Sequence, residues 1–254
     1  MRGPDDTWRE VAGSSPLSFP VGGAAWAGDR VVVVAGGPAP SVYTLDPSAG
    51  AWRRLETDIT LPDNGIVATA TGGVVIAAGT VDGCAAGSNP CAIERRLVVI
   101  LIDPASATVR AIDPGPLSVP AVGLPGPAVT AMVTDQEGVL VLAVDRTVQR
   151  PELATGTWRQ AGPAGCSPSP GVAALAPIWT GERLVVVCSP TQAEELDPRR
   201  QVWVPMTVRG TPPAPTAEPV IVWAGDRLLI WSGVASVQGS PTSDQGTTFT
   251  PAPL

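Results

Sequence analysis

Three acidic residues stand beside arginines in stretches that do not follow the rest of the chain's pattern. Asp82 and Glu94 belong to one segment that also contains Arg95 and Arg96, and Asp145 is followed directly by Arg146. Pairs of Asp and Glu are sufficient for acid–base hydrolysis of a glycosidic bond. We therefore expect ligand binding at these six residues, and the sequence assigns no catalytic residue. The alternative is a solvated loop rim with no chemical role.

Other kinds of catalytic site are excluded by composition. The chain has no histidine, which removes the commonest general base, the commonest transition-metal ligand and any Ser–His triad. It has neither a Gly-rich phosphate loop opening a helix nor a Gly-x-Ser-x-Gly elbow. We expect no metal and no cofactor. The absence of these motifs favours a protein that is not an enzyme. Whether it has a catalytic activity is left open by the sequence.

Charge argues against two classes of partner. All 16 basic residues are arginines, scattered singly or in pairs, and the net charge is −7. No basic patch for nucleic acid emerges, and an acidic protein is not attracted to an anionic membrane surface. No apolar run is long enough to span a membrane, and the first residues do not resemble a signal peptide.

A repeat defines the elements that would position these residues. Trp-x-Gly-Asp/Glu-Arg followed by four apolar residues begins at Trp26, Trp179 and Trp223, and weaker copies cover residues 70–79 and 134–144. An acidic residue with an aromatic residue five or six positions later follows most copies, as in Asp46 and Trp52. Short apolar runs bounded by Gly, Pro and Asp are typical of strands.

Each repeat therefore predicts four strands, here called a, b, c and d. A four-stranded unit of 40–50 residues is typical of a β-propeller blade, and blades must stack because each leaves two apolar faces. Five a–b hairpins predict an all-β propeller of five blades. Six or more blades, or part of a larger ring, are the alternatives.

The stretch "WAGDRVVVVAGG…VYTLDPSAGAWRRL" resembles bacterial kelch-type propeller repeats, and the resemblance extends from Trp8 to Phe249. The tail "TSDQGTTF" (242–249) is also similar to the Asp-box of sialidase-like propellers, which implies a c–d turn there. Copper chemistry of the galactose oxidase kind is not implied, because the chain lacks histidine. The single tyrosine, Tyr43, occupies an ordinary strand-c position, so we expect it to be structural.

We expect one domain over residues 1–254. Its blades lie near residues 21–62, 63–120, 121–168, 169–215 and 216–254, after an orphan outer strand and link at residues 1–20. That orphan strand, which carries Trp8, would complete the last blade and close the ring. Phe249 also has the pattern of an outer d strand, and the two assignments compete for one place.

The four cysteines fall where a propeller places its b–c and d–a links, which share one face. This favours disulfides Cys84–Cys91 and Cys166–Cys188 among three possible pairings. Disulfides would imply an oxidising compartment, hence an extracellular or cell-surface location. Four reduced thiols in a cytosolic protein are the alternative, while the spacing fits no standard zinc site.

Three functions remain open from the sequence. The first is a secreted or cell-surface recognition or scaffold module for a protein, peptide or glycan. The second is an Asp/Glu-dependent enzyme acting on a carbohydrate or natural product, which acids converging on one face would favour. The third is a structural module of a larger surface protein.

Overall fold

The structure, a computed structural model, contains only strands, turns and irregular segments in the part of the chain that it describes. It describes residues 16–17, 21–84, 93–117, 129–143, 147–163, 165, 178–189, 192–197, 199–209, 220–224, 226–231 and 246–250. Within these residues no helix is long and apolar enough to cross a membrane. The prediction of an all-β chain is confirmed.

The strands form five antiparallel sheets of four strands each. The first three sheets follow chain order from the inner to the outer strand. Sheet 1 contains β1 (Val21–Ala27), β2 (Arg30–Ala35), β3 (Ser41–Asp46) and β4 (Ala51–Leu55). Sheet 2 contains β5 (Asn64–Thr71), β6 (Val74–Cys84), β7 (Ile93–Asp103) and β8 (Thr108–Ile112). Sheet 3 contains β9 (Val129–Asp135), β10 (Gly138–Ala143), β11 (Val148–Glu152) and β12 (Thr157–Gly162).

Sheet 4 repeats this order and sheet 5 departs from it. Sheet 4 contains β13 (Ile178–Trp179), β14 (Leu184–Ser189), β15 (Gln192–Asp197) and β16 (Val202–Pro205). Sheet 5 contains β17 (Thr207–Arg209), β18 (Val220–Trp223), β19 (Leu228–Trp231) and β20 (Gly246–Thr250). Its spatial order is β17-β20-β19-β18, so its outer strand precedes the other three in the chain.

This order corrects two expectations for the end of the chain. Phe249 lies on β20, the third strand of sheet 5, where it pairs with Leu228 on one side and Val208 on the other. It is therefore not on an outer strand, and residues 246–249 form a strand instead of the Asp-box c–d turn. β17 occupies the outer place that Trp8 was expected to fill, and Trp8 itself lies outside the described residues. The number of blades in the closed ring stays a prediction.

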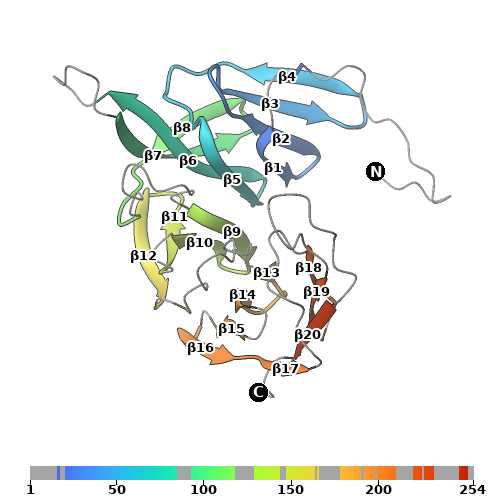
Figure 1. Cartoon of the computed structure of the whole chain (residues 1–254). Coiled ribbons are helices and arrows are strands. Elements are labelled where there is room, and N and C mark those ends of the chain that lie inside the picture. The colour runs from blue at the N-terminus through green and yellow to red at the C-terminus, as the bar shows by residue number, and fades with distance from the viewer. Residues whose placement is uncertain are drawn as a thin grey trace, which may run out of the picture.

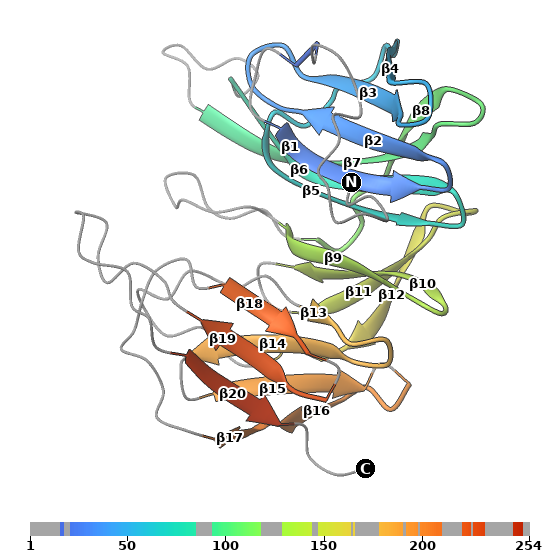
Figure 2. The ribbon, with the colours of Figure 1, turned by 90° about the vertical axis from the view of Figure 1, so that its right-hand side faces the viewer.

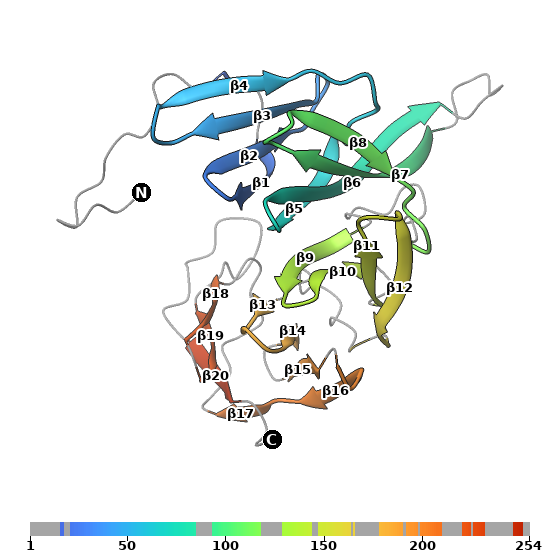
Figure 3. The same ribbon diagram turned by 180° about the vertical axis from the view of Figure 1, so that it is seen from behind.

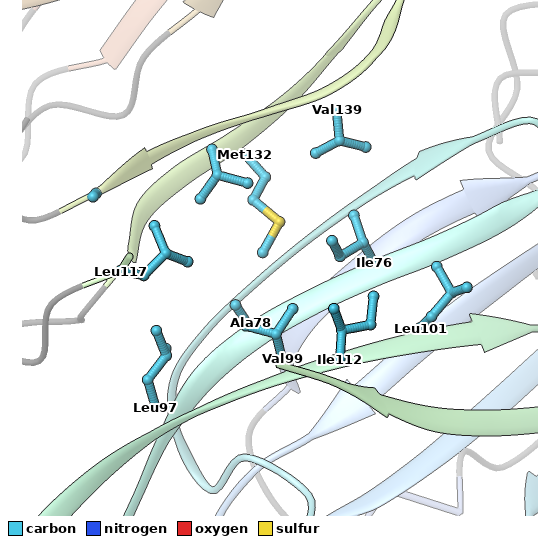
Figure 4. Close-up of a cluster of buried hydrophobic side chains, with 11 residues drawn as sticks. Ile76, Ala78, Leu97, Val99, Leu101, Ile112, Leu117, Met132 and Val139 are labelled. Carbon is cyan, nitrogen blue, oxygen red and sulfur yellow. The ribbon is translucent and has the colours of Figure 1, made fainter. Parts of the chain in front are cut away.

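The sheets stack face to face, with β1, β5, β9 and β13 towards the middle and β4, β12 and β16 outside (Figures 1 and 3). Apolar side chains of neighbouring sheets interlock. Between sheets 2 and 3, for example, Ile76 and Val99 pack with Met132 and Val139 (Figure 4). Burial of such apolar surface is the main force holding the sheets together.

The second tryptophan of the repeat connects adjacent sheets in two places. Trp158 Nε1 donates to Asp113 O at 2.7 Å, and Trp203 Nε1 donates to Pro163 O at 2.9 Å. In each case the acceptor directly follows the outer strand of the preceding sheet. The equivalent Trp52 Nε1 in sheet 1 is buried without a hydrogen-bond partner. Sheet 1 thus lacks the connection that sheets 3 and 4 make.

The acids of the repeated turns bind the backbone of their own turn. Asp46 Oδ1 accepts hydrogen bonds from the backbone N–H of Ser48 and Ala49, and Asp103 and Asp197 make the same turns. The Ser48 hydroxyl and these N–H groups hold the pKa of Asp46 below its ordinary value. Such side-chain to backbone bonds are what favour Asp in turns.

Chain direction divides the links between two ends of the sheets. The short a–b and c–d turns all lie at one end, on the right in Figure 2, which we call the turn end. The strand ends that the b–c links join lie at the other end, together with residues 56–63 between sheets 1 and 2, and we call it the link end. The four described residues of the predicted site, Asp82, Glu94, Arg95 and Arg96, belong to the link end, because they lie on β6 and β7 beside a b–c link.

Candidate functional site

The predicted loop of sheet 2 is mostly a long β-hairpin. β6 and β7 have 11 residues each and extend beyond the neighbouring strands (Figure 3). Asp82 and Arg95 lie directly opposite one another, and Arg95 donates from Nε to Asp82 Oδ1 at 2.8 Å and from Nη2 to Oδ2 at 3.2 Å. This bond with Arg95 lowers the pKa of Asp82. The two residues therefore form a cross-strand ion pair.

Glu94 and Arg96, the other described residues of the predicted site, do not join this pair. Glu94 and Arg96 are exposed and pair with Gly83 and Val81, so they point to the opposite face of the hairpin from Arg95. Asp145 and Arg146 lie outside the described residues, as do Cys91 and Cys166. Cys84 and Cys188 lie on described strands, although nothing is described of their side chains. The structure thus brings together two of the six, Asp82 and Arg95.

A pocket of about 380 Å³ lies at the link end between sheets 1 and 2. We call it the Asp63 pocket. Most of its wall comes from the segment between β4 and β5, with smaller contributions from the link before β3 and from β6. Its lining residues are Pro40, Ser41, Arg54, Leu55, Glu56, Thr57, Ile59, Thr60, Leu61, Asp63 and Val81.

Asp63 is held in place by its backbone. Its N–H donates to Thr80 O in sheet 2 at 3.0 Å, and its carbonyl accepts from Gly37 N of sheet 1 at 2.9 Å. Gly36 permits this approach, because a Cβ there would lie 2.5 Å from Asp63 O. Asp63 is thus fixed between two sheets by bonds that do not use its side chain.

The carboxyl group of Asp63 is unusual in having no side-chain donor. The residue is half-buried, and its Oδ1 is buried without a hydrogen-bond partner. Burial raises the pKa of Asp63, the nearby Asp82 carboxylate raises it further, and Arg95 opposes both effects. A carboxyl group with a raised pKa in a pocket is a candidate functional group. The site is therefore next to the predicted loop, at a residue that the sequence did not single out.

Sequence reasoning missed Asp63 for an identifiable reason. It lies in the link "LPDN" between two repeats, where an acidic residue is indistinguishable from an ordinary turn residue. The available signal was the Gly-Gly pair after β2, which permits a close approach of another backbone segment. The sequence does not say which segment approaches.

A second hollow, of about 270 Å³, lies at the turn end between sheets 3 and 4. It is lined by the turns of both sheets: Asp135, Gln136, Glu137, Trp179, Gly181, Glu182, Arg183, Asp197, Arg199 and Arg200. We call it the Arg-paired hollow. Arg199 Nη2 donates to Gln136 Oε1 at 2.9 Å across the hollow.

Two ion pairs account for the buried charges of this hollow. Arg150, 2% exposed, donates through Nη1 to Asp135 Oδ1 at 2.6 Å and through Nη2 to Oδ2. Arg183 donates through Nη1 to Oε1 of Glu195, which is 1% exposed. Burial without a partner would be costly for any of these groups. We interpret both pairs as structural.

The pKa values of the two acids differ in direction. For Asp135, burial opposes ionisation, but hydrogen bonds from Arg150 and from backbone N–H groups outweigh it, so its pKa is lowered. Burial raises the pKa of Glu195 in spite of Arg183. The number of hydrogen-bond donors determines the direction of the pKa shift, because Asp135 receives bonds from both a guanidinium and backbone N–H groups.

The chemistry open to these sites is limited. Among the described residues, no group of three or more His, Cys, Asp or Glu side chains is placed to hold a metal ion. The Asp63 pocket offers the carboxylates of Asp63 and Glu56, the guanidinium of Arg54, three hydroxyls and apolar walls. This arrangement suits the binding of a small group carrying a hydrogen-bond donor.

Comparison with known proteins supports the architecture. No protein-family model matches the chain, and no curated protein matches it. The solved structure of YjhT is similar with a TM-score of 0.57, over 88% of this chain and 75% of that chain, at 15% identity. At this identity the similarity shows the fold alone. Together with the stacked four-stranded sheets, it defines a β-propeller.

Proposed function

We propose that the chain is a recognition module that binds its ligand at the link end, through the Asp63 pocket. The observation that carries this proposal is the Asp63 carboxyl group, which is fixed by two backbone bonds and has no partner at Oδ1. A rigid scaffold that presents an unsatisfied polar group in a pocket is suited to binding. A protein, a peptide or a glycan is the proposed class of partner.

The experiment fills the pocket with a larger side chain at an exposed position and leaves the buried core unchanged. Thr60 is exposed and lines the pocket, so Thr60→Trp fills it. Thr157, exposed on β12 beside a c–d turn, offers the matched control Thr157→Trp at the opposite end. Immobilised peptide and glycan libraries should retain the parent and Thr157→Trp on the same members and release Thr60→Trp. Equal retention of both variants would refute this site.

The repeat and the cysteines support two finer proposals. The blades are of the kelch type, on the strength of the Trp and Asp pattern described above. The protein is secreted or exposed at the cell surface, with Cys84–Cys91 and Cys166–Cys188 bonded. The register supports the first bond, since Cys84 lies opposite Ile93, two residues after Cys91. Alkylation of all four thiols without reduction would refute both bonds.

An Asp/Glu-dependent enzyme is the second candidate, favoured by the raised pKa of Asp63 in a pocket. A general acid needs a carboxyl group that stays protonated near neutral pH. Hydrolysis of a glycosidic bond also needs a second carboxyl group, and Asp82, whose charge reaches Asp63, is bound to Arg95. This candidate is favoured if the parent hydrolyses a glycan that it retains and Asp63→Asn does not hydrolyse it.

A further inference from the structure

Two buried carboxyl groups of the described core have arginine partners, and the half-buried Asp63 does not. Asp135 has Arg150 and Glu195 has Arg183, whereas Asp63 has no side-chain donor at Oδ1. The nearest cation that acts on it, Arg95, is bonded to Asp82 through Nε and Nη2. Arg54 lines the same pocket, and its Nε lies 3.7 Å from Glu56 Oε1. The buried Oδ1 without a donor leaves the Asp63 carboxylate uncompensated, so the pocket favours a positive charge placed beside it.

We propose that the Asp63 pocket binds a primary ammonium group on an aliphatic stem, which the ligand supplies as the missing cation. This inference rests on the proposed function and specifies its ligand. The ammonium would bind Asp63 Oδ2, and the stem would lie along Ile59, Leu61 and Val81, which line the same pocket.

The geometry favours an ammonium over a guanidinium. A guanidinium binds best when both carboxylate oxygens accept parallel bonds, as Asp135 does from Arg150. Asp63 presents only Oδ2, since Oδ1 is buried. An ammonium is a compact point charge that one oxygen satisfies.

The cation must come from outside the chain. The sequence contains 16 basic residues and none is a lysine. No side chain of the protein, and none from a second copy of it, can therefore supply a primary ammonium. The net charge of −7 favours the approach of a cationic ligand.

Two sources share this chemistry, a small alkylamine and a lysine side chain of a peptide or protein. The probes are n-pentylamine, its neutral counterpart 1-pentanol, and N-acetyl-lysine methylamide with its Nε-acetylated and arginine counterparts. Binding is followed by methyl NMR of Ile59, Leu61 and Val81. Tighter binding of the lysine derivative than of n-pentylamine identifies a polypeptide source, and the reverse order identifies a small amine. Both orders agree with the proposal.

We expect each amine to bind at least about tenfold more tightly than its neutral counterpart, a difference of about 1.4 kcal/mol. Asp63→Asn should abolish this preference. Asp58→Asn should keep it, because Asp58 is exposed in the same link and does not line the pocket. The comparison of charged and neutral probes on the parent needs no variant, so it holds even if Asp63→Asn fails to fold.

The outcomes separate the two proposals. If neutral and charged probes shift the pocket methyl signals equally, or if the arginine derivative binds more tightly than the lysine derivative, the ammonium inference is wrong and the pocket remains a binding site. If Asp63→Asn binds the amines like the parent, the inference is also wrong. If no probe shifts these signals and Thr60→Trp loses no library member that the parent retains, both proposals fail.

Discussion

The Arg-paired hollow and the Asp63 pocket each hold buried carboxyl groups, at opposite ends of the sheets. In and beside the hollow, Asp135 and Glu195 have arginine partners from their own sheets. In the pocket, Asp63 is held by backbone bonds from two sheets, and its carboxyl group has no such partner. A charge paired within its own sheet supports the fold, whereas a charge left unpaired between two sheets is open to a ligand.

The largest expected effect comes from removing the cation of the best-bonded pair. Arg150→Met leaves Asp135 buried without its guanidinium and should lower the free energy of unfolding by about 3–5 kcal/mol. Urea denaturation measures this, with Arg53→Ala on the exposed side of β4 as a near-neutral control. A loss below about 1 kcal/mol would show that the hollow, like the pocket, tolerates an unpaired acid.

The same variant should change the response to acid. The folded pKa of Asp135 lies below its unfolded value, so its contribution is present above the unfolded pKa and is lost as pH falls through the folded pKa. Arg150→Met should remove this part of the acid sensitivity. Urea denaturation at several pH values between about 2 and 7 tests the sign.

A somewhat smaller effect is expected from the pair beside the hollow, and it depends on which charge remains. Arg183→Leu alone should destabilise by about 2–4 kcal/mol, because Glu195 stays buried. Arg183→Leu with Glu195→Leu should recover to within about 1 kcal/mol of the parent, since apolar replacements of whole buried pairs are often neutral. A double variant as unstable as the single one would mean that this pair specifies the packing of sheet 4.

Asp63 should behave in the opposite way from the paired acids. Asp63→Asn removes a charge without breaking a pair, so at pH 7 the variant should be within about 1 kcal/mol of the parent, or more stable. The folded pKa of Asp63 is raised by burial and by Asp82, against Arg95. Its contribution is therefore present below the unfolded pKa and is lost as pH rises through the folded pKa. Strong destabilisation by Asp63→Asn at pH 7 would place Asp63 among the structural acids.

The smallest expected effect belongs to the ion pair on the exposed hairpin. Asp82→Asn weakens a cross-strand pair whose side chains both contact solvent, and such pairs contribute little. We expect the melting temperature to fall by less than about 2 °C, with the difference disappearing in 1 M salt. A fall as large as that for Arg150→Met would mean that the hairpin is part of the core.

One position of the repeat shows what the sequence periodicity can predict and what it cannot. The strand-c position two residues before the repeated turn acid (Asp46, Asp103, Glu152 and Asp197) is occupied by Thr44, Leu101, Arg150 and Glu195 in sheets 1 to 4. All four side chains are buried. Repeat spacing is sufficient to align these positions and to predict that they face a neighbouring sheet. It does not reveal that Arg150 meets Asp135 or that Glu195 meets Arg183.

The sequence by itself determined the four-stranded unit, its Asp turns and the stacking of its blades, because these depend on local propensity and on apolar residues that recur at strand spacing. It also placed the predicted site residues at the same end of the sheets as the Asp63 pocket, since chain direction alone places the b–c links together. Only the tertiary structure decided that Asp82 and Arg95 pair with each other, that Phe249 lies on a third strand, and that Asp63 is the acid without a partner. Each of these depends on which segments meet across sheets, and contacts between distant segments leave no periodic signal in the sequence.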